Sequence, residues 1–186
     1  MRQNQIILSI IITIFFFLAI NLSAQKKTNL EGIEIGEMAP EIELSTVDGE
    51  DIKLSQLKGK IVLINFGAAW CAPCRKKTPA LLEILNNYKD SEFDDGEKGF
   101  VVFSVSLDKN EIAWKNSIEK DGTEGFINVG DMKAWKSTAA VTYNIKSIPS
   151  SVLIDGEGKV VAINLKTKDL NKKLKRMEKG SGWFWF

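Results

Sequence analysis

The chain has 186 residues, of which 44% are hydrophobic and 26% charged, a composition typical of a globular protein with one core. It contains no histidine and only two cysteines. These counts exclude Ser-His-Asp and Cys-His nucleophilic sites, histidine-ligated zinc and four-cysteine zinc sites. The net charge of +1 gives no reason to expect a nucleic-acid partner.

The first expected element is a targeting segment over residues 1–24. Arg2 supplies a positive charge, residues 6–20 are almost unbroken apolar sequence, and Ala24 is a small residue suited to cleavage. This pattern predicts a signal peptide that is cleaved after Ala24. An uncleaved membrane anchor is the alternative, because the apolar run is close to the roughly 17 residues of a short membrane span. Both interpretations predict an exported, periplasmic domain.

The rest of the chain, residues 25–180, is predicted to form one α/β domain. Short apolar runs between turn residues predict strands, and apolar residues at helical spacing predict helices. The expected elements are a hairpin of residues 41–44 and 52–54, a buried strand over 60–66, a helix over 75–88, a buried strand over 100–107, helices over 110–120 and 133–143, an antiparallel pair of 151–154 and 159–164, and a last helix around Leu170, Leu174 and Met177. Strands that alternate with helices predict a central sheet covered by helices.

The only two cysteines, Cys71 and Cys74, lie at a predicted strand-to-helix junction. Pro73 suits the first turn of the helix, where no backbone N–H donor is needed. The unpaired N–H groups of a helix N-terminus stabilise an anion, so this position favours a thiolate. The same turn carries three basic residues that favour the thiolate further: Arg75, Lys76 and Lys77.

A structural disulfide is the simplest alternative for two cysteines in an exported protein. The loop between Cys71 and Cys74 is so short, however, that a bridge removes little entropy from the unfolded chain. The spacing suits a pair that exchanges disulfides. The residues therefore predict thiol-disulfide exchange, with a redox-active disulfide in place of any cofactor and with no metal.

Two segments resemble motifs of a known family. Residues 66–79 resemble the active-site segment of thioredoxin-fold proteins, and residues 143–150 resemble the segment that carries their cis-proline. Three further segments restrict this resemblance to one group of thioredoxin-fold proteins: residues 36–40, 59–60 and 154–156. On these motifs the chain is identified as a member of the TlpA/ResA-like group of exported thiol-disulfide oxidoreductases, within the redoxin superfamily (AhpC/TSA). The resemblance implies a thioredoxin-like fold with a central mixed sheet, flanking helices and an N-terminal β-hairpin extension.

The resemblance also implies a role for each residue of the two motifs. Cys71 is implied to be the exposed attacking thiol and Cys74 the buried resolving thiol. Pro149 is implied to follow a cis peptide bond and to face the cysteines, with Ile148 offering backbone contacts to a partner. The implied partner-binding surface consists of Trp70, Pro73, Ile148 and Pro149.

Three positions depart from the family pattern and bear on the redox direction. Asn65 stands where cytoplasmic thioredoxins have a buried Asp, so no carboxylate base for Cys74 is expected there. Lys77 stands where many ResA-like proteins have Glu, and its charge favours the thiolate and a less reducing potential. Gly67 replaces a frequent aromatic residue and leaves room beside the site.

The implied partners are disulfide-bearing envelope proteins, among them apocytochrome c, with a membrane thiol-disulfide transporter as electron donor. A disulfide oxidase or isomerase is the alternative within the class, since the potential sets the direction. A non-catalytic envelope binding module and a copper-delivery protein are the alternatives outside it, although copper chaperones of this fold usually add a histidine. A peroxidase is disfavoured, because Ala68 stands where related peroxidases have Thr.

The aromatic tail over residues 181–186 is not explained by the family. Its four aromatic side chains suit packing on the domain, contact with a membrane or docking on a partner. The N-terminal segment is the other expected point of membrane contact.

Overall fold

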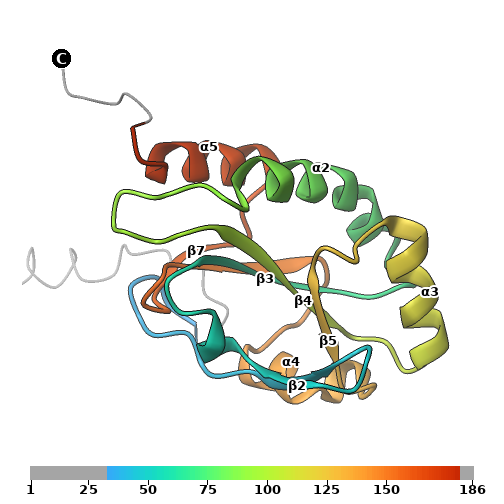
Figure 1. The fold of residues 1–186 in the computed structure, drawn as a ribbon. Coiled ribbons are helices and arrows are strands. Elements are labelled where there is room, and N and C mark those ends of the chain that lie inside the picture. The colour runs from blue at the N-terminus through green and yellow to red at the C-terminus, as the bar shows by residue number, and fades with distance from the viewer. Residues whose placement is uncertain (1–32, 181–186) are drawn as a thin grey trace, which may run out of the picture.

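The computed structural model describes residues 33–180. The predictions for the targeting segment over residues 1–24 and for the aromatic tail over 181–186 concern residues outside this range. Within it, a seven-stranded sheet lies between two layers of helices and turns (Figure 1). No helix within residues 33–180 is both long and apolar enough to cross a membrane.

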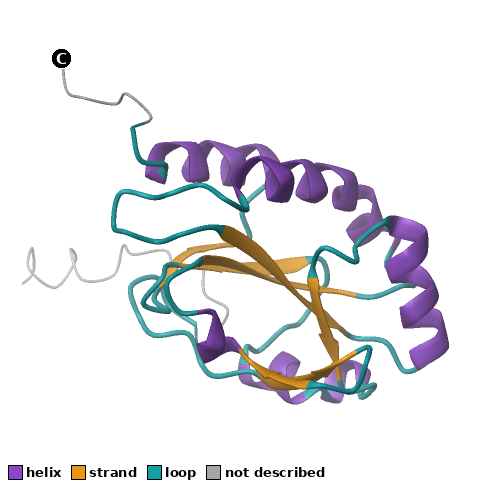
Figure 2. Ribbon diagram, viewed as in Figure 1, coloured by secondary structure: helices purple, strands orange, loops and turns teal. Residues whose placement is uncertain are grey.

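Strands and helices alternate over most of the chain (Figure 2). The strands are β1 (Glu43–Thr46), β2 (Asp51–Lys53), β3 (Ile61–Gly67), β4 (Phe100–Ser106), β5 (Ile127–Gly130), β6 (Ser150–Ile154) and β7 (Val160–Ile163). The α helices are α2 (Ala72–Tyr88), α3 (Glu111–Asp121), α4 (Thr138–Thr142) and α5 (Thr167–Met177), and two 3-10 helices are η1 (Leu54–Leu57) and η2 (Ala134–Lys136). The predicted α/β class is confirmed.

The order of strands in the sheet is β2-β1-β5-β4-β3-β6-β7. Strands β3, β4 and β5 are parallel to one another, whereas β6 runs antiparallel to β3. The ends of β3, β4 and β5 and the beginning of β6 therefore lie at one edge of the sheet, which we call the carboxyl edge. The expected N-terminal hairpin is confirmed, because β1 and β2 pair antiparallel and join the sheet through β5.

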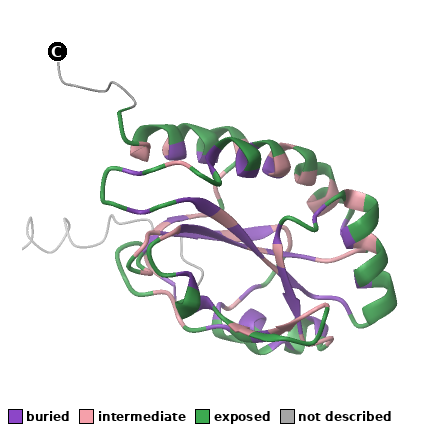
Figure 3. Cartoon of the chain, in the orientation of Figure 1, coloured by how far each residue is buried: buried purple, intermediate pink, exposed green. Residues whose placement is uncertain are grey.

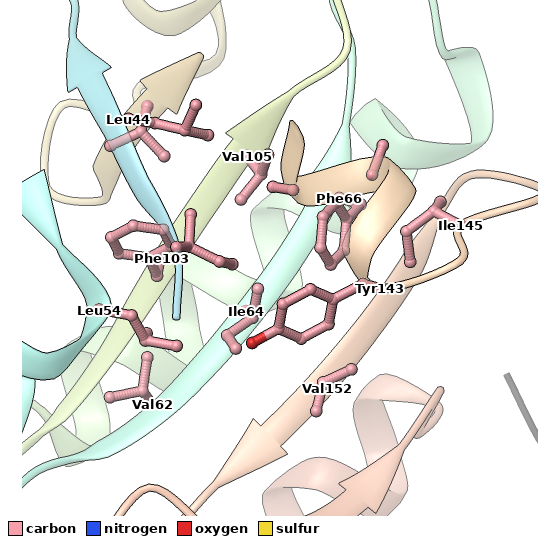
Figure 4. Packing of buried hydrophobic residues seen from close by; sticks show 14 of the residues in the cluster. Leu44, Leu54, Val62, Ile64, Phe66, Phe103, Val105, Tyr143, Ile145 and Val152 are labelled. Atoms are coloured by element: carbon pink, nitrogen blue, oxygen red, sulfur yellow. The ribbon is translucent and has the colours of Figure 1, made fainter. Parts of the chain in front are cut away.

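Strand β3 is the centre of the core because it buries side chains on both faces of the sheet. Val62, Ile64 and Phe66 point to one face, whereas Ile61 and Leu63 point to the other, as expected from the two-residue period of a strand. The first face packs against the hairpin, η1 and α4, and the second against α2 and α5 (Figures 3 and 4). A strand buried on both faces accounts for the unbroken apolar run in its sequence.

The single helix predicted over residues 133–143 is wrong. Two short helices, η2 and α4, occupy this region and are separated at Ser137, whose backbone is not helical. The carboxylate of Asp131 accepts hydrogen bonds from the backbone N–H groups of Lys133 and Thr138, both at 3.1 Å. Such bonds give the backbone partners outside a helix. Ala134, at φ +51°, also has a left-handed conformation that a continuous helix excludes.

Strand β5 was not predicted, because its four residues are too few to show a period. It is stabilised by pairing on both sides, with β4 in parallel and with β1 antiparallel. The amide of the buried Asn128 donates hydrogen bonds to the carbonyls of Thr123 and Phe126, at 2.7 and 3.2 Å. At the end of the strand, a Cβ on Gly130 would lie 2.9 Å from Met132 Cε.

Tyr143 joins the N-terminal segment to the core. Its side chain is fully buried, and its ring packs on Phe66 (Figure 4). Its hydroxyl donates a 2.6 Å hydrogen bond to the carbonyl of Pro40. Burial, with a smaller contribution from the charge of Glu41, raises the pKa of the phenol. The hydroxyl therefore stays a donor.

We expect Tyr143→Phe to lower the free energy of unfolding by about 1–2 kcal/mol, because the Pro40 carbonyl loses its donor while the ring packing remains. Urea unfolding measures this change. The control is Tyr88→Phe, because the Tyr88 hydroxyl lies 3.5 Å from the Asn171 carbonyl, which is long for a hydrogen bond. Equal losses in the two variants would show that the Pro40 bond is not the cause.

Candidate active site

Cys71, directly before α2, and Cys74, in the first turn of α2, form a disulfide at the carboxyl edge, with their Cα atoms 5.2 Å apart. Cys71 is the N-cap of α2, and its sulfur accepts a hydrogen bond from the backbone N–H of Cys74 at 3.2 Å. Pro73 lies in the first turn, as predicted, and that turn contains no acidic residue. The positive end of α2 is therefore directed at the Cys71 sulfur.

The expected exposure of the two cysteines is wrong for the disulfide-bonded protein. Cys71 is only 4% exposed, whereas Cys74 is partly exposed. Gly67 places no side chain over Cys74, since a Cβ there would lie 3.7 Å from Cys74 Cβ and 3.8 Å from its sulfur. The missing side chain leaves a cavity of about 70 Å³ beside Cys74, which Asn65 also lines. This space is large enough for water, so the room expected beside the site is confirmed.

Asp108 also lines this cavity, and the sequence pattern did not single it out. It follows β4 and is 2% exposed, and its two carboxylate oxygens accept hydrogen bonds from the Ala69 N–H at 3.2 and 2.9 Å. The Ser106 hydroxyl donates a third bond at 2.8 Å. Asp108 therefore ties the end of β4 to the loop that carries Trp70 and Cys71. The signal in the sequence that could have identified Asp108 as a site residue is its position directly after a buried parallel strand.

The positive charge of Arg75, which was expected to favour the thiolate, is paired with a carboxylate. Its guanidinium makes two hydrogen bonds to the carboxylate of Asp121, at the end of α3, including one from Nε at 2.7 Å. These bonds and the negative charge of Asp121 raise the pKa of Arg75. The pair joins α2 to α3, and it leaves Lys76 and Lys77 as the exposed cations of the first turns.

Pro149 lies at the carboxyl edge of the sheet. The Ile148–Pro149 peptide bond is cis, as predicted. Ser150 pairs with Phe66, so Pro149 lies beside the end of β3, where the loop to Cys71 begins. Ile148 and Pro149 are both partly exposed.

Three of the predicted residues come together in a second, smaller cavity. Asn65, Lys77 and Pro149 line a space of about 20 Å³, although they lie far apart in the sequence. Asn65 lines both cavities. It therefore connects the surroundings of Cys74 with those of the cis-proline.

Trp70 does not cover the site as a buried lid, because 58% of its surface is exposed. Its ring packs against that of Trp135 in η2, with 6.4 Å between the ring centroids and 54° between the planes. Trp135 is 44% exposed and was not predicted as a site residue. The only sign in the sequence that Trp135 could be functional was the position of a large aromatic residue in an otherwise polar stretch.

Within residues 33–180, no cluster of three or more His, Cys, Asp or Glu side chains is arranged to hold a metal ion. The reactive atoms of the site are the two sulfurs. A disulfide between cysteines three positions apart at a helix N-terminus, with a cis-proline at the same carboxyl edge of a mixed sheet, defines the class of thiol-disulfide oxidoreductases with a thioredoxin-like fold.

Comparison with known proteins agrees with this class. The model of the AhpC/TSA family matches residues 35–163, and the chain belongs to this family, as a ResA/TlpA-like thiol-disulfide oxidoreductase. It is 31% identical to the thiol-disulfide oxidoreductase ResA of Bacillus cereus, over 87% of this chain and 88% of that protein.

Two solved structures have the same fold. A thiol:disulfide interchange protein from a Bacteroides species has a TM-score of 0.71 and 33% identity, over 82% of this chain and 95% of its own. The thioredoxin domain of a thiol-disulfide oxidoreductase from Bacteroides vulgatus has a TM-score of 0.69 and 35% identity, over 77% and 97%. These similarities confirm the thioredoxin-like fold.

We expect Gly67→Ala to slow the alkylation of Cys74 several-fold in a Cys71→Ser background. The new methyl group would make ordinary contacts with Cys74, so it covers the thiol without straining the strand. Mass spectrometry after timed reaction with iodoacetamide measures the rate. The control is Gly125→Ala, whose methyl group would contact Leu85 instead. The same rate in both variants would contradict the role of Gly67.

Proposed function

We propose that this protein is an exported reductant that breaks disulfides of envelope proteins through Cys71 and Cys74. The observation that carries the proposal is the disulfide between these residues at the N-terminus of α2, beside the cis bond before Pro149. Export is supported by the apolar run over residues 6–20.

The first step is attack by Cys71. In the reduced protein its thiolate, stabilised by the N-terminus of α2, attacks one sulfur of the partner's disulfide. A bond forms between Cys71 and that sulfur, and the partner's own disulfide bond breaks. The partner sulfur that leaves takes a proton from water. Trp70, next to Cys71 in the chain, and Ile148 and Pro149 at the same edge of the sheet form the proposed surface against which the partner lies.

The second step is resolution by Cys74. Its thiol loses a proton to water, for which the cavity beside Gly67 has room. The Cys74 thiolate then attacks the Cys71 sulfur, forms the disulfide that the structure contains and releases the second partner thiolate, which takes up a proton. In total, two electrons pass from the two cysteines to the partner. Of the two protons that the partner gains, Cys74 releases one to water and water supplies the other, because Cys71 starts as a thiolate.

The proposed partners are disulfide-bearing envelope proteins, of which apocytochrome c is one candidate. A membrane thiol-disulfide transporter is the proposed source of the electrons that return the Cys71–Cys74 disulfide to the dithiol. Each partner has to present a disulfide or a dithiol at the carboxyl edge.

We expect reduced Cys74→Ser protein to accumulate a mixed disulfide with insulin, because Cys71 can attack but nothing resolves the product. Mass spectrometry under non-reducing conditions detects the conjugate, and Cys71→Ser is the control that should form none. Wild-type protein should also accelerate the reduction of insulin by dithiothreitol. If Cys71→Ser accelerates it equally, the domain acts as a binding module.

The reduction potential separates a reductant from an oxidase. A value near −270 mV, about that of thioredoxin, supports the proposal, and a value near −120 mV, about that of the strong oxidant DsbA, would overturn it. Equilibration with glutathione, followed by tryptophan fluorescence, measures the potential.

Lys77 should raise this potential, since its charge stabilises the thiolate of the reduced form. We expect Lys77→Glu to be more reducing by about 30 mV, which corresponds to a tenfold change in the exchange equilibrium. Lys172→Glu, on the exposed side of α5, makes the same change of charge and is the control. Equal potentials in the two variants would show that Lys77 does not act on the site.

A further inference from the structure

Trp70 and Trp135 form one exposed aromatic surface next to Cys71. Their rings pack against each other, and 58% and 44% of their surfaces remain exposed. Exposed aromatic side chains that adjoin a reactive site are typical of binding surfaces, where tryptophan contributes strongly to affinity. We call this pair the aromatic ridge.

The loop over residues 131–137 holds Trp135 firmly in place. Ala134 is 5% exposed and Ser137 fully buried, so both sides of Trp135 are anchored in the core. The Asp131 carboxylate binds two backbone N–H groups of this region. Met132 and Ala134 have positive φ angles of 57° and 51°, which are unfavourable for non-glycine residues. Strain of this kind persists where the surrounding contacts fix the backbone.

The segments that meet at the carboxyl edge are rich in exposed lysines. Within residues 33–180, none of these side chains lies within ion-pair distance of a carboxylate. They are Lys76, Lys77, Lys109, Lys133, Lys136 and Lys146. The loops over residues 107–110, 131–137 and 144–149 carry two carboxylates, Asp108 and Asp131, and both accept hydrogen bonds from backbone N–H groups. Two further carboxylates lie close by: that of Glu111 pairs with Lys115, and that of Asp121 binds Arg75.

The small net charge of the whole chain therefore hides a group of exposed lysines at the carboxyl edge, two of which, Lys133 and Lys136, lie in the same loop as Trp135. We call these six lysines the lysine rim. Clusters of one sign steer partners of the opposite sign and repel those of the same sign. Lys133 and Lys136 flank Trp135 in the sequence, so a partner that reaches the ridge also meets the rim. An apolar side chain then suits the ridge, and acidic residues suit the rim.

We infer that the aromatic ridge and its lysine rim select a polypeptide whose disulfide is next to an aromatic side chain and among acidic residues. This inference rests on the proposed exchange with polypeptide disulfides and names the class of partner. Trp135 binds the aromatic side chain, and Lys133 and Lys136 bind the acidic residues. A small uncharged disulfide reaches Cys71 without using either feature.

Three synthetic peptides with one disulfide each test the inference. The first has phenylalanine next to a cysteine and acidic flanks, the second has lysine flanks, and the third has serine in place of phenylalanine. We expect the reduced wild-type protein to reduce the first with a kcat/KM about tenfold above the other two, equivalent to 1.4 kcal/mol. Added salt should abolish the preference for acidic flanks. Acid quenching, alkylation and mass spectrometry give the rates.

Variants then separate the two features. Trp135→Ala should lose the preference for phenylalanine, and Trp135→Phe should keep most of it. Lys133→Glu with Lys136→Glu should lose the preference for acidic flanks. The control is Lys172→Glu with Lys175→Glu, which makes the same change of charge on the exposed side of α5 and should keep it. All variants should reduce 2-hydroxyethyl disulfide at the wild-type rate.

The outcomes distinguish this inference from the proposed function. Equal rates for the three peptides would overturn the inference while leaving disulfide exchange intact. If no peptide is reduced although 2-hydroxyethyl disulfide is, exchange with polypeptides fails and the inference fails with it. If Trp135→Ala slows 2-hydroxyethyl disulfide as well, Trp135 supports the active site and does not bind the partner.

Discussion

The burial of β3 on both faces is the constraint on which the active site depends. Its side chains pack against α2 and α5 on one face and against α4 and the hairpin on the other, while β4 and β6 pair along its sides. Because β3 is packed on both faces and paired with a strand on each side, it cannot slide or tilt without opening the core. The loop to Cys71 starts at its end. The position of the disulfide is therefore set by the packing of the whole sheet.

The same packing brings distant parts of the chain to the carboxyl edge. Asp108 follows β4, Trp135 follows β5 and Pro149 precedes β6, and each lies at this edge because of the direction of its strand. Polar contacts then lock the loops, since the Asp108 carboxylate binds the Ala69 N–H and that of Asp131 binds two N–H groups. Reactive groups held on rigid supports need little reorganisation when a partner binds.

The net charge of the whole chain is small, but the charged groups around the disulfide are unevenly distributed. The N-terminus of α2 and the exposed Lys76 and Lys77 favour a thiolate, whereas the Arg75 guanidinium is bound to Asp121. Asp108 lies close to Cys74, but its carboxylate is occupied by backbone and hydroxyl donors. The balance favours the reduced form, which moves the potential towards that of an oxidant. This tendency opposes the proposed role as a reductant and makes the potential the decisive property of the site.

The sequence by itself determined the chemistry and most of the fold. Cys71 and Cys74 at a strand-to-helix junction, with no histidine, indicate thiol-disulfide exchange, and the long apolar run of β3 is readable because two-sided burial leaves a continuous pattern. These features are local, so no distant contact is needed to recognise them.

Only the tertiary structure decided what depends on neighbours far away in the chain. Strand β5 exists because β1 and β4 pair with it, and residues 133–143 break into two helices because Asp131 binds the backbone there. No side chain at Gly67 covers Cys74, which is the more exposed cysteine, and Trp135 lies beside Trp70 because the two rings pack together. Each of these outcomes depends on which groups the fold brings together, and periodicity and local motifs do not contain that information.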